Sequence, residues 1–445
     1  MIEDIKINYF KELSDFISIK SISTYSEFKN EMDKAVDWLK NKLKSLGFLL
    51  EVYKSDGHPI VFGELNNLKD KPTMLLYGHY DVQPPEPLDE WKTEPFQLTE
   101  KGDFLYGRGI SDDKGQLFAH IKALEIFKEE KGEIPFNVKI IFEGEEEIGS
   151  PSLKKFLAEY KDRLKADFAI ISDNPMLGRG LPSLSYGLRG LLYIELKLIG
   201  PDKDLHSGRF GGVIPNPCIH LCKVISSIKK KSGKINIKGF YEDVLELKEE
   251  ERDNFAKLPI SDENYKEMAN VFGLDKERGF SAIECIWARP SFDVNGITGG
   301  FQGEGTKTII PSFAKAHLSF RLVPNQDPEK IFKLVKNHII KNCPKNLRIE
   351  INKKETAKPV LINIKNQYLN KIKKAMEKGF GKEVHLIRQG GTIPIVSLLQ
   401  NFLKVPVILM GLGLPNENAH APNEKLLKEN FVNGVKSLCN FYNTL

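Results

Sequence analysis

Two kinds of hydrophobic pattern alternate along the 445-residue chain, and each predicts a different kind of β-sheet. Residues 73–77 and 137–142 are short, mostly apolar runs, which are typical of strands buried on both faces in a parallel sheet covered by helices. Residues 192–198 and 314–322 alternate apolar with polar side chains, which is typical of strands with one wet face. The pattern therefore predicts two sheets of different character.

The boundaries between the two patterns fall near residues 187 and 358, and they indicate the domain organisation. The first pattern occupies residues 1–187 and resumes in residues 358–445. These two segments are predicted to form one α/β domain, in which helices flank a mixed, mostly parallel sheet. Residues 188–357 are predicted to form a small α+β, two-layer domain inserted into the first. The length of the chain also favours two domains over a single core.

Three further segments carry a local prediction. Residues 1–47 are expected to form two amphipathic helices, the second of which ends at Gly47. The Pro-rich residues 82–105 are expected to form a long loop, of the kind that borders a site or packs as a lid. Residues 241–278 are charge-dense and helical in pattern, which indicates a surface insertion whose role the sequence leaves open.

Charge and cysteine content narrow the classes of protein and of partner. The 65 basic and 60 acidic residues nearly cancel, and the basic residues are not clustered with aromatic side chains, so we expect no nucleic-acid partner. No apolar run of 18 residues is present, so we expect no membrane span. Five cysteines, an odd number without metal-type spacing, favour reduced thiols and a cytoplasmic protein.

Histidines and acids recur directly after the apolar runs, where open α/β sheets place their ligand sites. Collected along the chain, these residues are His79, Asp112, Glu147, Asp173 and His420. Mixed nitrogen and oxygen ligands suit zinc, with manganese or cobalt as alternatives. Two divalent cations would be neutralised by three carboxylates and a bridging hydroxide, so this set of ligands predicts a site for two cations.

Each motif also has a purely structural interpretation, and these alternatives stay open at the level of sequence. His79 alone could be a surface histidine beside a turn. The pair Asp112–Asp113 could cap the helix that begins near Lys114. The acidic run that begins at Glu143 could be an exposed loop.

The same residues predict a hydrolytic chemistry. Two cations about 3.5–4 Å apart would acidify a bridging water and polarise a carbonyl group. Glu146 would remain free of metal because neighbouring side chains diverge in an extended segment, and it could pass the proton of the water to a leaving amine. Asp81, two residues beyond His79, could hold the far ring nitrogen of that histidine.

Three motifs, in this order, resemble the signatures of one family. They are Gly78-His79-Tyr80-Asp81-Val82-Gln83-Pro84, Gly107-Arg108-Gly109 through Asp112-Asp113-Lys114-Gly115, and Glu143-Gly144-Glu145-Glu146-Glu147-Ile148-Gly149-Ser150. The chain resembles, over essentially its whole length, the two-zinc aminoacylase/carboxypeptidase/dipeptidase family, and most of all its carnosinase-like dipeptidase branch. The family also includes acetylornithine deacetylase and succinyl-diaminopimelate desuccinylase.

This resemblance implies a role for each residue of the metal site. His79 and Asp173 would hold one metal ion, and Glu147 and His420 would hold the other. Asp112 would bridge the two ions, with a cis bond to the following residue. Glu146 would be the general base, and Asp81 would orient the first histidine.

The resemblance also implies a substrate site in the inserted domain, which would serve as a lid and dimerisation domain. His206 would help to stabilise the oxyanion, and in dimeric members it reaches the site of the partner subunit. Arg321 would clamp the substrate carboxylate with its planar fork, although the alternative that it pairs with an acid across the sheet stays open. The pocket would also be lined by Thr308, Gly391 and Thr392.

The leading hypothesis is a metal-dependent dipeptidase or short-peptide carboxypeptidase that cleaves an amide beside a free carboxylate. In this hypothesis a metal-bridging hydroxide attacks, Glu146 is the base, and the enzyme is a homodimer. A close rival is a deacylase of N-acyl amino acids, because the chemistry is identical and only the pocket for the amine-side group differs. Gln389 stands where carnosinase-like members often carry Glu, which removes a negative charge near the substrate and bears on recognition of a free amino terminus. A hypothesis from another class is an inactive metal-binding scaffold.

Overall fold

The computed structural model describes residues 6–445, so residues 1–5 of the first predicted helix lie outside the described part. The described chain forms two compact units. Unit 1 takes the chain up to Tyr186 together with Ile362–Ile387 and Leu398–Leu445, and unit 2 comprises Gly187–Leu361 and Arg388–Ser397. Arg388–Ser397 thus groups with unit 2, whereas our sequence boundaries placed it in the returning segment 358–445. Within residues 6–445, every helix is too short or too polar to cross a lipid bilayer.

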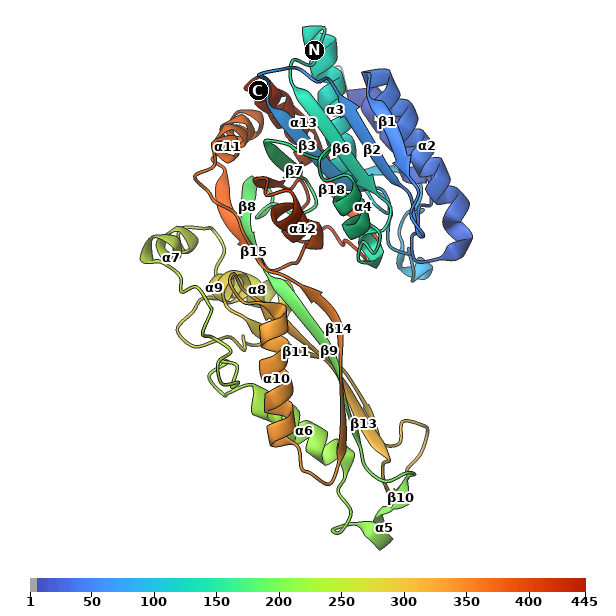
Figure 1. The fold of residues 1–445 in the computed structure, drawn as a ribbon, viewed down its shortest axis with the longest axis vertical. Helices are drawn as coiled ribbons and strands as arrows, with labels where there is room; N and C mark the ends of the chain where they lie inside the picture. The colour runs from blue at the N-terminus through green and yellow to red at the C-terminus, as the bar shows by residue number, and fades with distance from the viewer. Residues whose placement is uncertain (1–5) are drawn as a thin grey trace. The chain divides into compact units, whose positions relative to one another are not determined.

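The main sheet is mixed, with parallel strands at its centre (Figure 1). Its order is β1-β2-β6-β3-β7-β17-β8-β15, and β16 also pairs with β8. Parallel pairing joins β6 to β3, β3 to β7 and β7 to β17, while the outer pairs are antiparallel. The strands are β1 (Leu49–Tyr53), β2 (Ile60–Leu65), β3 (Thr73–His79), β6 (Asn137–Glu143), β7 (Phe168–Ile171), β8 (Ser183–Leu188), β15 (Val360–Leu361), β16 (His385–Gln389) and β17 (Val407–Met410).

Helices cover both faces of this sheet, which explains the apolar strands. On one face α2 packs on β1 and β2, and α3 packs on β3 and against α1 and α13, which in turn packs against α11. On the other face lies α4 (Figure 1), and the ring of its Phe156 packs near the ring of Phe62 of β2. The helices are α1 (Lys6–Ser18), α2 (Lys29–Leu46), α3 (Lys114–Lys131), α4 (Leu153–Glu159), α11 (Gln367–Phe380), α12 (Pro394–Phe402) and α13 (Lys428–Tyr442). The helix α2 ends at Gly47, whose φ of 97° is left-handed, as the sequence predicts.

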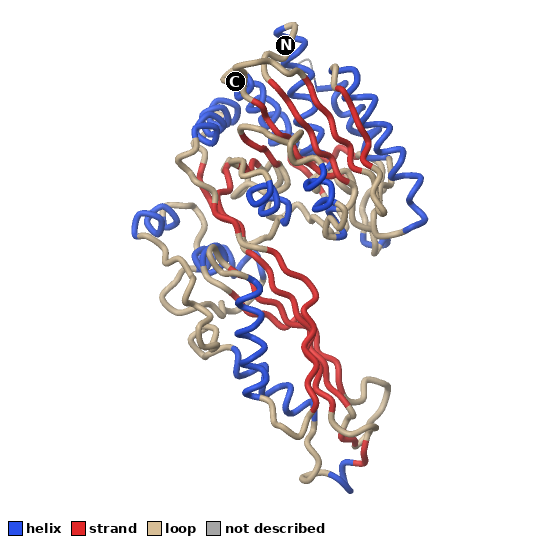
Figure 2. Tube along the Cα trace, in the orientation of Figure 1, coloured by secondary structure: helices blue, strands red, loops and turns tan. Residues whose placement is uncertain are grey.

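Unit 2 is a two-layer α+β sandwich (Figure 2). Its antiparallel sheet has the order β11-β13-β9-β14, and α6 and α10 pack on one face. Along β9 buried residues alternate with half-buried ones, as the alternating pattern predicts. The elements are β9 (Gly190–Ile199), β11 (Ser291–Gly299), β13 (Phe313–Leu322), β14 (Arg348–Ala357), α6 (Pro217–Ile228) and α10 (Pro328–Asn342).

Smaller elements complete each unit and correct parts of the prediction. The expected loop 82–105 contains a 3-10 turn, η2 (Leu88–Glu90), and the strand β4 (Thr99–Lys101). With β5 (Phe104–Tyr106) and β18 (Lys425–Leu427), β4 forms a three-stranded sheet. The segment 241–278 holds only two short helices, because its long polar stretches bury few side chains. Unit 2 also contains α5 (Ser207–Phe210), α7 (Glu249–Ala256), α8 (Asp262–Ala269), α9 (Ala282–Ala288) and the paired strands β10 (Leu205–His206) and β12 (Ile309–Ile310).

Candidate metal centre

The expected ligands come from one edge of the main sheet, where the parallel strands end. His79 is the last residue of β3, and it pairs in register with Glu143, the last residue of β6. Asp173 follows β7 by two residues. Asp112 precedes α3, and Glu147 lies in the short 3-10 helix η3 (Glu146–Ile148). His420 lies in the loop between β17 and β18, so five separate segments supply the expected ligands at this edge.

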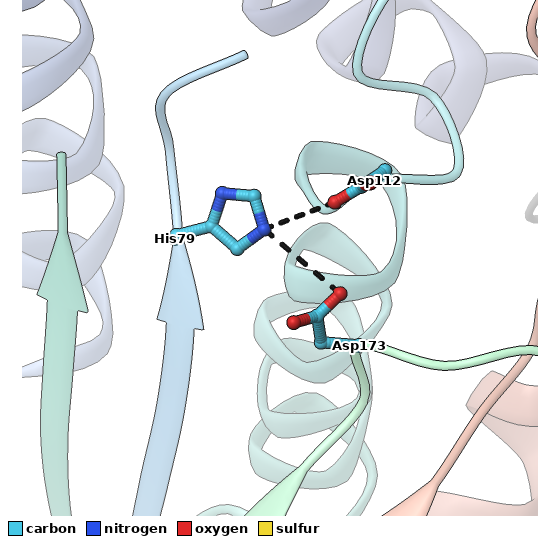
Figure 3. Close-up of side chains that lie close together, drawn as sticks. All are labelled: His79, Asp112 and Asp173. Carbon is cyan, nitrogen blue, oxygen red and sulfur yellow. Dashed lines mark hydrogen bonds and ion pairs between the residues drawn. The ribbon is translucent and has the colours of Figure 1, made fainter. Parts of the chain in front are cut away.

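One group of ligand atoms surrounds His79, which is wholly buried (Figure 3). Its Nε2 lies 3.1 Å from Oδ1 of Asp112 and 3.9 Å from Oδ1 of Asp173. Its Nδ1 lies 3.1 Å from the main-chain oxygen of Asp81. Because a carbonyl oxygen only accepts, Nδ1 donates to it, and this leaves Nε2 as the ring nitrogen that faces the two carboxylates.

A second group of ligand atoms shares Asp112 with the first. Nε2 of His420 lies 3.0 Å from Oδ2 of Asp112 and 3.1 Å from Oε2 of Glu147. The two oxygens of Asp112 therefore face different histidines. Within each group the ligand atoms all lie within 4.8 Å of one another, which is close enough for one cation to be held by all three residues.

Two further acids position this site without joining either group. Asp81 accepts hydrogen bonds from the main-chain nitrogens of Glu146 and Glu147, at 3.2 and 3.1 Å, and its Oδ1 lies 3.4 Å from Nδ1 of His79. Asp113 accepts a hydrogen bond from the main-chain nitrogen of His79, at 3.2 Å. The Asp112–Asp113 bond is cis, as the resemblance implies. The side chain of Asp113 makes no capping hydrogen bond to α3, so the capping interpretation of this pair does not hold.

Sequence reasoning missed the residues that hold the Asp112 loop. Glu424, wholly buried, accepts hydrogen bonds from the main-chain nitrogens of Gly109, Ser111 and Asp112 at 2.8–3.1 Å. Its charge is paired with Arg108, at 2.9 Å. Glu424 lies four residues beyond His420, so this one carboxylate ties the loops of two expected ligands together. The only signal in the sequence was the presence of an acid close to the last motif.

The carboxylates at the site carry more negative charge than the nearby positive groups neutralise, and the pKa values of the site residues reflect this excess. Burial raises the pKa of Asp173 to about 6, and the neighbouring Asp112 carboxylate adds to the shift. Burial opposes ionisation of Asp112 as well, but hydrogen bonds to His420 and His79 lower its pKa. The hydrogen bond to Asp112 raises the pKa of His420 to about 10. A site that recruits protons in this way fits divalent cations, which would supply the same positive charge.

Glu146 lies beside this site but belongs to neither group of ligand atoms. Burial raises the pKa of its carboxyl well above the ordinary value, and the carboxylates of Asp173 and Asp112 raise it further. A carboxyl group that holds a proton more readily than usual is suited to accept one during a reaction. Cations bound beside Glu146 would offset part of this shift.

Three expected substrate residues meet within unit 2. The Nη1 of Arg321 donates to Oγ1 of Thr392, at 3.0 Å, and that hydroxyl donates to the main-chain oxygen of Arg189, at 2.6 Å. The nitrogen of Arg189 donates to the main-chain oxygen of Gly391, at 3.1 Å. The residues opposite Arg321 on the two neighbouring strands are Ser291 and Leu191, so the alternative of an acid directly across the sheet is wrong.

Arg189 is a second residue that the sequence did not reveal. Its Nε donates to the main-chain oxygen of Gly390, at 3.0 Å. Burial, followed by repulsion from the Arg321 guanidinium, lowers the pKa of Arg189 to about 10. Two guanidinium groups close enough to repel each other create a positive potential that would attract an anion.

His206 and Thr308 form a separate cluster in unit 2. His206 pairs with Ile309, and the nitrogen of Ser207 donates to the main-chain oxygen of Thr308, at 3.0 Å. The exposed ring of His206 accepts a hydrogen bond at Nδ1 from the nitrogen of Gly208, so its Nε2 carries a proton. This cluster lies near one end of β13, which begins at Phe313, whereas Arg321 lies near the other.

Comparison with known proteins places this geometry in a family. Residues 75–444 match peptidase family M20/M25/M40. The chain is 33% identical to the Cys-Gly metallodipeptidase dug1 of Schizosaccharomyces pombe over 465 residues, covering 100% of this chain and 97% of that protein. It is also 33% identical to the human Beta-Ala-His dipeptidase over 389 residues, covering 86% and 77%.

A solved structure supports the same assignment. The M20 family metallo-carboxypeptidase Sso-CP2 from Sulfolobus solfataricus matches with a TM-score of 0.87 at 36% identity, covering 98% of this chain and 99% of that one. The likeness therefore extends over both units of the fold and over the sequence that builds the site. This chain is an enzyme of peptidase family M20/M25/M40.

Proposed function

We propose that this enzyme is a two-metal dipeptidase or short-peptide carboxypeptidase that hydrolyses the amide bond next to a free carboxylate. The observation that carries the proposal is the position of Asp112 between two histidines, with one oxygen 3.1 Å from Nε2 of His79 and the other 3.0 Å from Nε2 of His420. A carboxylate in this position is suited to bridge two cations. The relatives named Cys-Gly metallodipeptidase and Beta-Ala-His dipeptidase support the substrate class.

The proposed ligands of one cation are His79 and Asp173, those of the other are Glu147 and His420, and Asp112 is shared. Zinc suits these nitrogen and oxygen ligands, with manganese or cobalt as alternatives. When bound, the two cations would acidify a water molecule between them and polarise the carbonyl group of the substrate. Asp81 would hold His79 in the tautomer that presents Nε2 to this site.

Glu146 is the proposed general base. It would take a proton from the attacking water and deliver that proton to the nitrogen of the leaving amine, so that the amide bond breaks and a free amino group departs. Two features support this role: the carboxyl belongs to neither group of ligand atoms, and burial raises its pKa. The hydrogen bond from its main chain to Asp81 fixes the backbone from which this side chain extends.

The carboxylate of the substrate would bind to Arg321, next to the turn formed by Gly390, Gly391 and Thr392. The planar fork of an arginine matches a carboxylate with two parallel hydrogen bonds. The positive potential of the pair Arg189 and Arg321 supports this placement. A Cβ added at Gly391 would meet no atom within 4 Å, so this side of the turn has room for an approaching group.

His206 and Thr308 would complete the site of a partner subunit in a homodimer. Arg321 lies eight positions beyond Phe313, the residue that begins β13 at the end near their cluster, and eight steps along a strand span about 26 Å. A dipeptide extends over only about 7 Å, so one substrate cannot touch both clusters of the same chain. The Nε2 proton of His206 could then be donated to the oxyanion that forms in the partner's site.

All five cysteines are free thiols, which supports our expectation of a cytoplasmic enzyme.

A panel of substrates tests the proposal. Purified enzyme with zinc or manganese should cleave Cys-Gly and β-Ala-His, and it should cleave the same dipeptides much more slowly when their carboxylate is an amide. Glu146→Gln should lower kcat by about 10²–10⁴-fold and keep the metal content, because it removes only the base. The control is Glu133→Gln, which makes the same change at an exposed position.

Two other outcomes would replace the proposal. Cleavage of N-acetyl or N-succinyl amino acids alone would establish a deacylase, a candidate that the uncharged side chain of Gln389 favours. Tight metal binding with no hydrolysis of any member of the panel would establish a metal-binding scaffold. A Glu146→Gln variant as active as the unmodified enzyme would refute the mechanism while leaving the family assignment intact.

A further inference from the structure

The insertion that the sequence left without a role, residues 241–278, carries the short helices α7 and α8 and is followed directly by α9; together we call these three helices the helical cap (residues 249–288). Its helices are tied to one another by charged side chains. Arg252 of α7 donates to Glu284 of α9, at 2.6 Å. Asp262 of α8 accepts a hydrogen bond from the nitrogen of Ala282, at 2.7 Å. The cap is therefore a connected support within unit 2.

An ion pair joins the helical cap to the strand end that leads into the Gly390–Gly391 turn. Oε1 of Glu251, on α7, lies 2.5 Å from Nη2 of Arg388. Both side chains are largely withdrawn from solvent, with 19% of the Glu251 side chain and 6% of the Arg388 side chain exposed. Solvent and salt screen such a poorly solvated pair far less than a surface pair, so removing one partner should weaken the link between the cap and the strand measurably.

A second contact joins the helical cap to the turn itself. A Cβ added at Gly390 would lie 2.8 Å from Cγ2 of Ile286, on α9, and 3.2 Å from Nη2 of Arg189. The turn thus packs closely against the cap and Arg189 on one side. A Cβ added at the next residue, Gly391, would meet no atom within 4 Å, and Thr392 receives the hydrogen bond of Arg321. The cap therefore contacts the turn at Gly390, whereas Gly391 is left with room for an approaching group.

We propose that the helical cap positions the carboxylate-binding turn, and that Glu251 and Arg388 are the positioning residues that transmit this support. Arg388 directly precedes Gln389 and the turn, so displacement of its side chain shifts the turn relative to Arg321. The pair adjoins the turn in the sequence, so we expect the effect to fall on binding of the carboxylate. This inference rests on the proposed function, because it assigns a role in recognising the same carboxylate.

The test compares Glu251→Gln with Glu250→Gln, which makes the same change at the neighbouring, exposed position of α7. KM and kcat are measured on a dipeptide and on its C-terminal amide. Glu251→Gln should raise KM for the dipeptide on the order of tenfold and change kcat little, because it removes binding that is equal in ground and transition states. KM for the amide should stay the same, because that substrate offers no carboxylate to the turn.

Further variants keep the test decisive. Arg388→Gln should resemble Glu251→Gln, and the double variant should be no worse than either, because the pair acts as one unit. Metal content and melting temperature, measured in parallel, identify any variant that is merely misfolded; if Glu251→Gln fails to fold, Glu251→Asp replaces it. Equal KM values for Glu251→Gln and Glu250→Gln, or an equal rise for dipeptide and amide, would overturn the inference. An unmodified enzyme that does not distinguish dipeptide from amide would instead overturn the proposed function.

Discussion

Replacing Asp81 with Asn should weaken the metal site although Asp81 belongs to neither group of ligand atoms. The carboxylate of Asp81 is wholly buried, and its two oxygens accept hydrogen bonds from the main-chain nitrogens of Glu146 and Glu147, at 3.2 and 3.1 Å. One of them also lies 3.4 Å from Nδ1 of His79. Asn has nearly the same shape, but one of its two terminal atoms is a donor. That donor must face another N–H group, so at least one of the hydrogen bonds is lost.

The size of the effect follows from the bond that is lost. A hydrogen bond to a charged group contributes about 1.5–3 kcal/mol, and about 1.4 kcal/mol corresponds to a factor of ten. Asp81→Asn should therefore lower metal affinity about 10–100-fold, which is the usual range for a residue that orients a ligand. At saturating metal the rate should also fall, because Glu146 loses one of the bonds that fix its backbone.

Metal affinity is measured by competition with a chromophoric chelator, and hydrolysis is measured in excess metal. Asp89→Asn is the matched control, because it makes the same change at an exposed position of the nearby 3-10 turn. An Asp81→Asn variant that binds metal within twofold of the unmodified enzyme would refute this reasoning. In that case the position of His79 would depend on its buried strand and on the bond to Asp113 alone.

Two further predictions concern backbone packing and protons. Gly411→Ala would drive a Cβ into the main-chain oxygen of Asn174, which is the neighbour of Asp173. We therefore expect a loss of about 1–3 kcal/mol in unfolding free energy and weaker metal binding. The control is Gly273→Ala, whose added Cβ meets no atom within 4 Å. Because the pKa of His420 is raised to about 10, its protonated form stabilises the metal-free fold fully below pH 6.5, and this contribution is lost as pH rises to about 10. Metal added at pH 7.5 must displace that proton, so calorimetry in buffers of different ionisation enthalpy should detect proton release, and its absence would contradict the assigned pKa.

The local part of the site could be predicted from the sequence because it depends on short-range patterns. An apolar run predicts a buried strand, and the end of such a strand in an α/β fold is where ligands lie. His79, at the end of β3, and Asp173, just beyond β7, followed from that rule. The alternation in residues 192–198 likewise predicted β9 and a sheet with one wet face.

The partners that hold the site could not be predicted, because they are far apart in the sequence. Gly109 and Glu424, which share a hydrogen bond, are separated by 315 positions, and no local pattern links them. The same is true of Arg189 and the turn at Gly390, and of Glu251 and Arg388, which are 137 positions apart. The sequence around a buried acid does not indicate which distant residue will neutralise its charge.

The sequence by itself determined which residues could bind metal and at which strand ends they would lie. This was possible because hydrophobic periodicity, and the residues that end a strand or helix, are properties of neighbouring positions. Only the tertiary structure decided that the two oxygens of Asp112 face different histidines, that two arginines contact one turn, and that α9 of the helical cap packs against this turn. Those features arise when distant segments pack together and bury charges that must then find partners among whatever residues the fold has placed beside them.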